Sequence, residues 1–360
     1  MKRTTPQTDI LRTVHALYDD PKVFCDTYWL VYCDDDKYST WIKRSDKKEN
    51  ESFTYTDSWW KTVSKTFAIY ADWLWIAPAW SEVYINPEKN AHHVAVAVDG
   101  SGNKQYLYNE VRRTQRDLLK SYKLLEFVPW VSRVRKWYTS TLRKNKVTSR
   151  EHTLAVMLWL EDHWAIRIWS WVNEPESSDG LTSLKPDQFH ATDTTFWVTY
   201  TAKGSKERTV RFKDHSKLTH IVERSMEEYA HSNTTYLFES DGSPISPQVF
   251  SHHLQTVAQE PLTPKEFRTW HGSVAAFSAI AHNDTPTIKE ITTQASEELW
   301  NTPVVAKRSY IHPHLLESYR EWKFDALFEA TRGKRCKAYV SRDEMDFYEL
   351  LPELYNQYMK

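Results

Sequence analysis

The stretch Asn301-Thr302-Pro303-Val304-Val305-Ala306-Lys307-Arg308-Ser309-Tyr310 places a polar side chain, a proline, two basic residues and a tyrosine close together. Basic side chains can hold a phosphate. A tyrosine phenol can attack a phosphodiester and store it reversibly, because the phenolate is also an acceptable leaving group. The stretch therefore predicts a phosphate site with Tyr310 as its nucleophile. Since the chain has 20 tyrosines, this prediction depends on residues elsewhere.

Three basic residues upstream lie in segments that suit phosphodiester cleavage: Arg167, Lys203 and Arg268. Arg167 falls between two isoleucines in a predicted core helix over 153–169, where it either meets a carboxylate or points into a phosphate site. Lys203 lies in a turn between predicted strands. Most turn lysines are simply solvated, but a hairpin tip can also carry a cation into a groove. Arg268 lies in the first turn of a helix that begins at Pro264.

The composition is that of a globular chain long enough for two domains, with 360 residues, 40% hydrophobic and 26% charged. Only 7 glycines occur and none forms a phosphate-binding loop motif, which excludes the common nucleoside-triphosphate sites. Three cysteines form no C-x-x-C pair, and neither an apolar leader nor a long apolar run is present. These features predict an intracellular protein without a membrane span.

The formal net charge of −1 counts against a nucleic-acid partner, because neutralisation of phosphates drives such binding. Basic residues nevertheless cluster between positions 104 and 213, so a DNA-binding face requires segregated charge. Any single cluster can also be a solvated helix face. The clusters are Arg112/Arg113/Arg116, Arg133/Arg135/Lys136, Arg143/Lys144/Lys146 and Lys203/Lys206/Arg208/Arg211.

Histidines occur in three close groups, none with zinc-type spacing to cysteine. We expect surface or packing roles for them, with no metal and no cofactor. The groups are His92-His93, His252-His253 and His312-Pro313-His314.

Periodicity predicts an α+β protein of two domains. Residues 1–112 look β-rich, with a hairpin around Asp34-Asp35-Asp36, a helix near 60–71 and a second hairpin with its turn at 99–102. Residues 113–360 look mainly α, with a β-hairpin inserted at 195–212. The expected helices there cover 111–150, 153–169, 214–235, 246–260, 264–280 and 287–299, followed by a polar helical tail over 313–360.

Segments of the first domain resemble type IB DNA topoisomerases of the small poxvirus and bacterial kind. Residues 76–85, Ile-Ala-Pro-Ala-Trp-Ser-Glu-Val-Tyr-Ile, are similar to that family's IPPAW(T/S)DVWI. Residues 102–109, Gly-Asn-Lys-Gln-Tyr-Leu-Tyr-Asn, are similar to its GRKQYxYH. Residues 41–44 and 53–57 resemble its GIxR and FxYxD. In the family the Gln-Tyr-x-Tyr strand lies in the major groove of DNA, which implies DNA contacts for Lys104, Gln105, Tyr106 and Tyr108.

Segments of the second domain carry the same resemblance. Residues 265–270, Lys-Glu-Phe-Arg-Thr-Trp, are similar to K-D-[FL]-R-T-[WY], and residues 301–310 are similar to [HN]-T-P-[AT]-[VI]-x-[KR]-x-[SA]-Y. Residues 200–203, Tyr-Thr-Ala-Lys, resemble F-x-[GA]-K. Arg167 and the later segment 180–185 resemble xxRxG followed by GLxTLK.

The resemblance implies a type IB DNA topoisomerase with the catalytic fold shared by these enzymes and tyrosine recombinases. Tyr310 would attack a DNA phosphate and form a 3′-phosphotyrosyl ester, and Lys203 would protonate the leaving 5′ oxygen. Arg167, Arg268 and Asn301 would bind the non-bridging oxygens. The enzyme would clamp duplex DNA as a monomer and relax it without ATP or metal. Further basic residues expected at the DNA are Arg116, Lys265 and Lys307.

The chain departs from the family pattern at several of these positions. Asn301 stands where most members have histidine, so it can donate a hydrogen bond but cannot become a cation. Trp169 replaces a glycine and Ser170 a following lysine. In the first domain Ala77 replaces a proline and Asn103 an arginine. The departures predict a slower enzyme rather than an inactive one.

Two other functions remain open from the sequence. A tyrosine recombinase has the same order of catalytic residues, but it usually carries histidines where this chain has Lys265 and Thr269. A catalytically quiet DNA-binding protein agrees with the near-neutral charge, with Trp169 and with Asn301.

Overall fold

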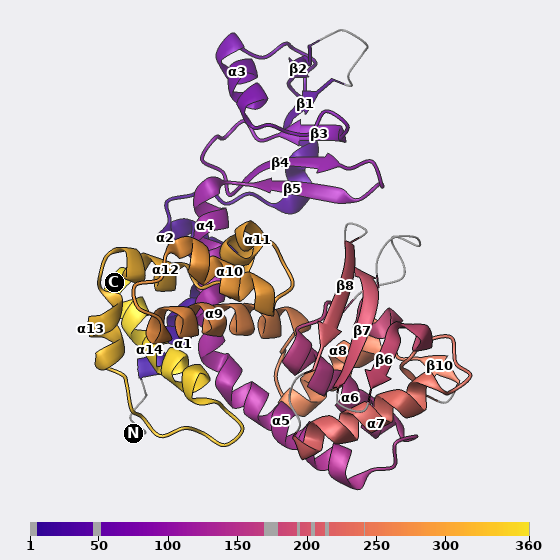
Figure 1. Ribbon diagram of the computed structural model, residues 1–360. Helices are drawn as coiled ribbons and strands as arrows, with labels where there is room; N and C mark the ends of the chain where they lie inside the picture. Colours follow the sequence, from indigo (N-terminus) through magenta and orange to yellow (C-terminus); the bar gives the residue numbers. More distant parts are fainter. Residues whose placement is uncertain are drawn as a thin grey trace. The chain divides into compact units, whose positions relative to one another are not determined.

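The computed structural model describes residues 6–45, 52–168, 179–192, 195–202, 206–212, 216–240 and 242–359 (Figure 1). It mixes helices and antiparallel sheets, which agrees with the predicted α+β class. The chain divides into two compact units, Met1–Tyr122 and Lys123–Lys360. The boundary predicted after residue 112 falls inside helix α4 (Glu110–Tyr122), because that helix packs on α1 (Pro6–Asp19) of the first unit.

The first unit is built on a five-stranded antiparallel sheet in the order β2-β1-β3-β4-β5. The predicted hairpin with its turn at 99–102 is present as β4 and β5. The strands are β1 (Ile42–Arg44), β2 (Tyr55–Thr56), β3 (Ser81–Ile85), β4 (His93–Val98) and β5 (Lys104–Tyr108), and helix α3 covers Lys65–Trp73.

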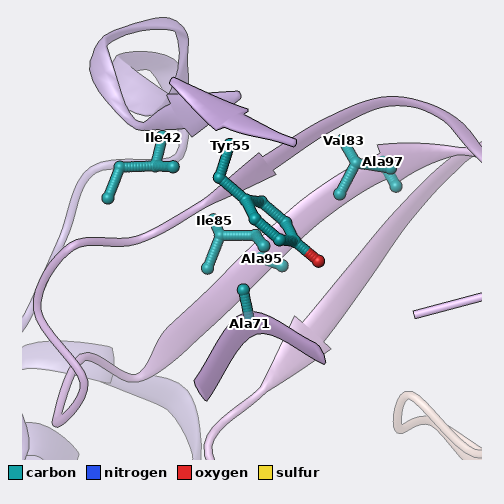
Figure 2. Close-up of a cluster of buried hydrophobic side chains, with 7 residues drawn as sticks. All are labelled: Ile42, Tyr55, Ala71, Val83, Ile85, Ala95 and Ala97. Carbon is teal, nitrogen blue, oxygen red and sulfur yellow. The ribbon is translucent and has the colours of Figure 1, made fainter. Parts of the chain in front are cut away.

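The core of this unit lies between the sheet and α3. Figure 2 shows the Tyr55 ring among side chains of the sheet, with Ala71 of α3 beside it. The Tyr55 hydroxyl donates to Asp72 at 2.6 Å. Arg44 is buried and donates to the carbonyl oxygens of residues 76, 77 and 80, so the arginine of the GIxR-like segment fixes the IAPAW-like loop.

The hairpin predicted around residues 34–36 is wrong. Residues before it form helix α2 (Pro21–Thr27), and a 3₁₀ helix η1 covers Asp35–Thr40. The helix begins there because the Asp20 carboxylate accepts hydrogen bonds from the backbone N–H groups of Lys22 and Val23, with Pro21 at the first helical position. The aromatic run that follows does not pair with residues 38–42, because Val31 forms a bridge with the distant Ala91 instead.

The second unit is helical, with one three-stranded antiparallel sheet in the order β6-β7-β8 inserted between α6 and α7, as predicted. Helices α9, α10 and α11 pack in succession (Figure 1). The first elements are η2 (Lys123–Glu126), α5 (Phe127–Lys144), α6 (Arg150–Trp164), η3 (Leu181–Ser183), η4 (Pro186–Gln188), β6 (Phe189–Thr192), β7 (Thr195–Ala202) and β8 (Lys206–Arg211). The later ones are α7 (Lys217–Ala230), β9 (Glu239–Ser240), β10 (Ser243–Pro244), α8 (Pro247–Ala258), α9 (Pro264–His282), α10 (Ile288–Glu298), α11 (Pro303–Ser309), α12 (Pro313–Arg320), α13 (Phe324–Glu329) and α14 (Arg342–Tyr358).

The last helix is not the polar tail that the sequence suggested. One face of α14 is buried through Phe347, Leu350 and Leu354. Its acidic side chains also serve packing, because Glu344 accepts two hydrogen bonds at 2.8 Å from Arg135 of α5. Charge in this segment is therefore paired inside the unit.

Arg135 itself belongs to a basic cluster that we expected at a DNA-binding face, and this expectation is wrong. Its guanidinium also donates to Asp162 of α6 at 2.7 and 2.9 Å. Tyr138 donates to Asp162 at 2.9 Å, and Trp270 of α9 donates to Glu344 at 2.9 Å. We call Arg135, Tyr138, Asp162, Trp270 and Glu344 the Arg135 network.

Helix α6 ends earlier than predicted. Ala165, at its C-cap, has a φ of 46°, and this left-handed conformation turns the chain out of the helix. Arg167 consequently lies in the extended segment after α6 rather than on it, and its carbonyl oxygen accepts a hydrogen bond from the N–H of Leu181 at 3.0 Å.

Tryptophan is unusually frequent at left-handed backbone positions. Ten non-glycine residues in the described part of the chain have positive φ, and five of them are tryptophans. The five are Trp29, Trp60, Trp75, Trp300 and Trp322.

No helix within the described ranges is both long and apolar enough to cross a membrane.

Candidate active site

Tyr310 lies at the C-cap of α11, where its side chain is 9% exposed. The short helix starts with Pro303, and the Thr302 hydroxyl accepts a hydrogen bond from its first turn. The backbone is fixed on both sides of the tyrosine, because Ser273 of α9 donates to the Tyr310 carbonyl and accepts from the N–H of His312, each at 3.0 Å.

Gly272 explains how closely this segment approaches α9. A Cβ added at Gly272 would lie 3.1 Å from the Tyr310 Cβ and 2.7 Å from a methyl carbon of Leu299. Only glycine leaves room for this contact without displacing the tyrosine.

Arg268 lies one turn earlier on α9 and is 4% exposed. Its guanidinium donates to the carbonyl oxygens of Ala165 and, at 3.0 Å, of Leu299, which are the C-cap residues of α6 and α10. The guanidinium carbon lies 4.8 Å from the centre of the Tyr310 ring. The buried Nε atom has no hydrogen-bond partner in the described part of the chain.

The Tyr310 hydroxyl accepts hydrogen bonds from both Arg268 and Arg167. Burial acts to raise the pKa of Tyr310, but the charges and hydrogen bonds of the two arginines outweigh it and leave the pKa below its ordinary value. A lower pKa makes the phenolate, the attacking form, more accessible near neutral pH.

Glu161 is a buried carboxyl on α6 on which the charge of Arg268 acts. Burial raises its pKa well above the ordinary range, and neither oxygen has a hydrogen-bond partner in the described residues. Burial therefore weakens any compensation of the guanidinium charge by Glu161.

Asn301 follows α10 and lines a cleft of about 480 Å³ in the second unit. Its buried Nδ2 atom has no hydrogen-bond partner among the residues described. This donor is therefore free for a ligand. The cleft is lined by Glu207, Arg208, Ser296, Glu297, Trp300, Asn301 and Thr302.

The structure thus joins Tyr310, Arg167 and Arg268 directly. Lys203 lies outside the described residues, as does Trp169. Lys265 and Lys307 have exposed side chains.

The candidate DNA-binding residues of the first unit make contacts within that unit. Gln105 donates to Asp99 at 2.7 Å, and the Lys104 ammonium lies 4.1 Å from the centre of the Tyr38 ring. The rings of Tyr106 and Tyr108 stack on each other with centroids 6.3 Å apart. In α4, the Arg116 guanidinium lies 4.2 Å from the centre of the Tyr18 ring.

Of the histidine groups, His92 and His93 are buried beside Cys33. The Cys33 sulfur lies 3.4 Å from His92 Nδ1, and the two histidine rings stack with centroids 4.2 Å apart. Ligand atoms of the three residues lie within 4.8 Å of one another, so they could hold a metal ion. The backbone N–H of Cys33 donates to the same His92 nitrogen at 3.2 Å, which gives that nitrogen a packing role.

Sequence reasoning did not single out Arg208, Tyr200, Gly272 or Ser273. Arg208 appeared only as one member of a basic cluster. The signal that could have found it is strand pairing, because Arg208 of β8 lies directly opposite Tyr200 of β7.

Comparison with known proteins agrees with this geometry. The family model described as "Eukaryotic DNA topoisomerase I, catalytic core" matches residues 109–305, more than half of the chain. A protein named DNA topoisomerase 1B, from Acanthamoeba polyphaga mimivirus, is 23% identical over 263 residues, which cover 68% of this chain and 77% of that relative. The chain therefore belongs to the DNA topoisomerase I family, as an isomerase of type IB.

Proposed function

We propose that this chain relaxes supercoiled duplex DNA by cutting and rejoining one strand through Tyr310, without ATP or a metal ion. The observation that carries the proposal is the Tyr310 hydroxyl, held between Arg167 and Arg268 with its pKa lowered. Two guanidinium groups that act on one phenol suit a phosphate that gains negative charge under attack.

In the cleavage step the Tyr310 phenolate attacks the phosphorus atom, a bond forms between them, and the bond to the 5′ oxygen breaks. Lys203 supplies the proton that the leaving 5′ oxygen takes up. The 3′ phosphate remains esterified to the tyrosine while the free 5′ end rotates. The 5′ hydroxyl then attacks the ester in the reverse reaction. Because the ester conserves the energy of the broken bond, the cycle needs no ATP.

Arg167, Arg268 and Asn301 bind the non-bridging oxygens in this proposal. The unpaired Nε of Arg268 and Nδ2 of Asn301 support it, since buried donors without partners are rare. The second unit would then have the catalytic fold of tyrosine recombinases and type IB topoisomerases.

The first unit grips the duplex in the same proposal, through Lys104, Gln105, Tyr106, Tyr108 and Arg116. The exposed Lys265 and Lys307 of the second unit contact the phosphate backbone. A single intracellular chain clamps the DNA, and affinity falls log-linearly with salt, with a slope near −0.9 for each phosphate contact.

The test is relaxation of a supercoiled plasmid with no ATP and with EDTA present. The parent protein should relax the plasmid and yield a covalent DNA adduct when trapped with SDS. Tyr310→Phe removes only the phenolic oxygen, so folding and DNA binding should survive while relaxation and adduct both disappear. An adduct that persists in this variant would show that another residue is the nucleophile.

The acid role of Lys203 has its own test. Lys203→Ala should slow cleavage of ordinary DNA strongly. It should slow cleavage much less on a duplex whose 5′-bridging oxygen is sulfur, because a thiolate leaves without a proton. Equal slowing on both substrates would remove Lys203 from that role.

A further inference from the structure

Arg208 lies on β8 directly opposite Tyr200 of β7. Its guanidinium donates a hydrogen bond to the hydroxyl of that tyrosine, which is 5% exposed. The family pattern at this position is phenylalanine, so the hydroxyl that holds Arg208 is an addition in this chain. Burial raises the pKa of Tyr200, which keeps this hydroxyl protonated.

The same guanidinium faces the active site. Arg208 lines the cleft of about 480 Å³ together with Asn301 and Thr302, which follow α10. Burial and then the charges of Arg167 and Arg268 lower the pKa of Arg208, which places the three arginines within electrostatic reach of one another. Glu207 and Glu297 line the same cleft, but neither is among the groups that act most strongly on Arg208.

Three guanidinium groups that repel one another destabilise the folded chain unless an anion binds among them. Arg208 is only partly buried, at the wall of an open cleft, so an anion can reach it. Asn301, which lines the same cleft, offers a neutral donor where most of the family has a histidine.

We propose that Arg208 is a further catalytic residue that binds a non-bridging oxygen of the phosphate attacked by Tyr310 and supplies the positive charge that Asn301 lacks. The proposal rests on the proposed function. Tyr200 acts as a positioning residue, because its hydroxyl fixes the guanidinium without touching the phosphate.

The first measurement is single-turnover cleavage of a suicide duplex by Arg208→Ala. We expect a loss of about 10- to 100-fold, the range for one hydrogen bond to a charged group. Arg211→Ala is the matched control. It removes the same charge from the same strand, where the Arg211 guanidinium lies 5.2 Å from the centre of the Trp197 ring, and it should slow cleavage far less than Arg208→Ala.

Two further variants separate a catalytic from a structural role. Tyr200→Phe keeps the ring but releases Arg208, so cleavage should slow by less than in Arg208→Ala while the melting temperature changes little. Asn301→His should restore more of the rate in the Arg208→Ala background than it adds to the parent. The reason is that Arg208 and a histidine at position 301 would each supply the same missing positive charge beside the phosphate.

The outcomes also separate this inference from the function on which it rests. If the parent forms no adduct with DNA, the proposed function fails. If the parent cleaves and Arg208→Ala cleaves as fast as Arg211→Ala, only the role of Arg208 is overturned. A purely structural Arg208 would give equal effects of Asn301→His in both backgrounds, which would also overturn it.

The left-handed tryptophans carry a second, independent inference. Four of them directly follow the C-cap of a helix: Trp29, Trp75, Trp300 and Trp322. After α12, the N–H of Trp322 donates to Tyr319 O at 3.1 Å and that of Lys323 to Ser318 O at 2.8 Å. This is the Schellman arrangement, whose left-handed residue is usually glycine.

The exposure of these side chains agrees with the backbone. Trp29, Trp60, Trp75 and Trp322 are each at least 80% exposed, whereas Trp159 and Trp270 are at most 1% exposed. A bulky residue in the left-handed region is an outlier that normally requires compensating contacts, and these side chains have almost none. Trp41 and Trp169 also stand where the family patterns have glycine.

We infer that the five left-handed tryptophans are glycines in the protein that the source organism synthesises. We infer the same for Trp169. One cause covers all of them, since the codon UGA is read as tryptophan in some genetic codes and as glycine in others. It also accounts for 17 tryptophans beside 7 glycines in one chain.

The gene gives the sharpest test. Codons 29, 60, 75, 169, 300 and 322 should be UGA, whereas those for Trp80, Trp159 and Trp270 should be UGG. Peptide masses of the protein from its natural source should show glycine at the first set. In recombinant protein, Trp75→Gly and Trp322→Gly should each raise the melting temperature, while Trp159→Gly should lower it. UGG at the left-handed positions, or tryptophan in the native peptides, would overturn the inference.

Discussion

Two arginine-rich regions of the second unit use the same side chain in opposite ways. In the Arg135 network the guanidinium donates to two carboxylates, Asp162 and Glu344, at 2.7–2.9 Å. Around Tyr310, Arg167 and Arg268 donate to a phenol and to carbonyl oxygens, and the nearby buried Glu161 has a raised pKa. The first region pairs its guanidinium with carboxylates, whereas no ion pair joins Arg167 or Arg268 to a carboxylate among the described residues.

The presence or absence of a carboxylate partner distinguishes these two groups of arginines better than burial does. Arg268 is 4% exposed and Arg135 is also largely buried, so both pay desolvation costs. What differs is whether a carboxylate compensates the charge. Variants in the two regions should therefore fail in different ways.

The largest effect is expected in the Arg135 network. Arg135→Met leaves Asp162 and Glu344 buried without their cation and should cost about 3–5 kcal/mol of unfolding free energy. Arg133→Met on the same helix is the control, since the Arg133 Nε donates to a single carbonyl, that of Ala258, at 2.6 Å. Denaturant unfolding measures both. Equal losses would mean that the carboxylate pairs contribute nothing special.

The stability of the Arg135 network should also depend on pH, in opposite directions in the parent and in Arg135→Met. Although burial acts to raise it, hydrogen bonds and charge from Arg135 lower the pKa of Glu344 to about 2. A depressed pKa adds stability that is present above the ordinary carboxyl range and is lost as pH falls toward 2. In Arg135→Met the buried carboxyl has a raised pKa instead, so mild acid should stabilise the variant relative to neutral pH.

The next effect concerns catalysis. Arg167→Ala should slow single-turnover cleavage by a factor on the order of 10²–10³, the loss for one oxyanion donor. Its unfolding free energy should stay within about 0.5 kcal/mol of the parent, because Arg167 is only half-buried. The pKa of Tyr310 should rise, which shifts the rate–pH profile to higher pH. A large stability loss with an unchanged profile would place Arg167 among the structural arginines.

Arg268→Ala should be intermediate between the two regions. It should lose a similar factor of about 10²–10³ in rate. It should also lose about 1–3 kcal/mol of stability, because the carbonyl oxygens of Ala165 and Leu299 lose their donor. Calorimetry and cleavage kinetics on one preparation separate the two losses.

A smaller effect is expected at Asn301. Asn301→Ala removes the unpaired buried donor and should slow cleavage by about tenfold or less, the value of one neutral hydrogen bond. Asn301→His should raise the rate modestly, and it alone should gain rate as pH falls from about 8 to 6, because histidine titrates near pH 6.5. Cleavage by Asn301→Ala at the parent rate would show that residue 301 does not touch the phosphate.

The smallest effect is expected at Gln105, whose amide is already bonded to Asp99. Reading a base would require breaking this hydrogen bond, so Gln105→Ala should weaken DNA binding by no more than about 1.5 kcal/mol. Titration against duplexes of different sequence measures the loss. A much larger loss confined to one sequence would make Gln105 a base reader despite its internal partner.

The sequence predicted those parts in which local rules and packing agree. The hairpins at 94–108 and 195–212 and the helix beginning at Pro264 were correct, because turn residues and caps specify them locally. The first hairpin, around residues 34–36, was wrong because Val31 pairs with the distant Ala91, a contact that local strand propensity does not specify. The end of α6 at Ala165 could not be predicted from the sequence, since nothing in the sequence marks an alanine that adopts the left-handed conformation.

The candidate site shows the same limit. Motif spacing identified Tyr310, Arg167 and Arg268, and the structure brings their side chains together. Motif spacing could not tell that Arg135 meets two carboxylates whereas Arg208 meets the Tyr200 hydroxyl, because these partners depend on which elements pack together. For Arg167 the choice between a carboxylate and a ligand was open until the contacts with Tyr310 were known.

The pinned backbone around Tyr310 has a mechanical consequence. In the proposed cycle the free 5′ end of the cut strand rotates while the 3′ end stays bound to the protein through one tyrosine ester. Any torque on the DNA is therefore transmitted to the protein at Tyr310. Ser273 is hydrogen-bonded to the backbone at Tyr310 and at His312, and Gly272 allows α9 to contact the Tyr310 segment closely. In the proposed cycle, helix α9 therefore holds the backbone at Tyr310 in place, and this keeps the ester aligned with the returning 5′ hydroxyl after each revolution.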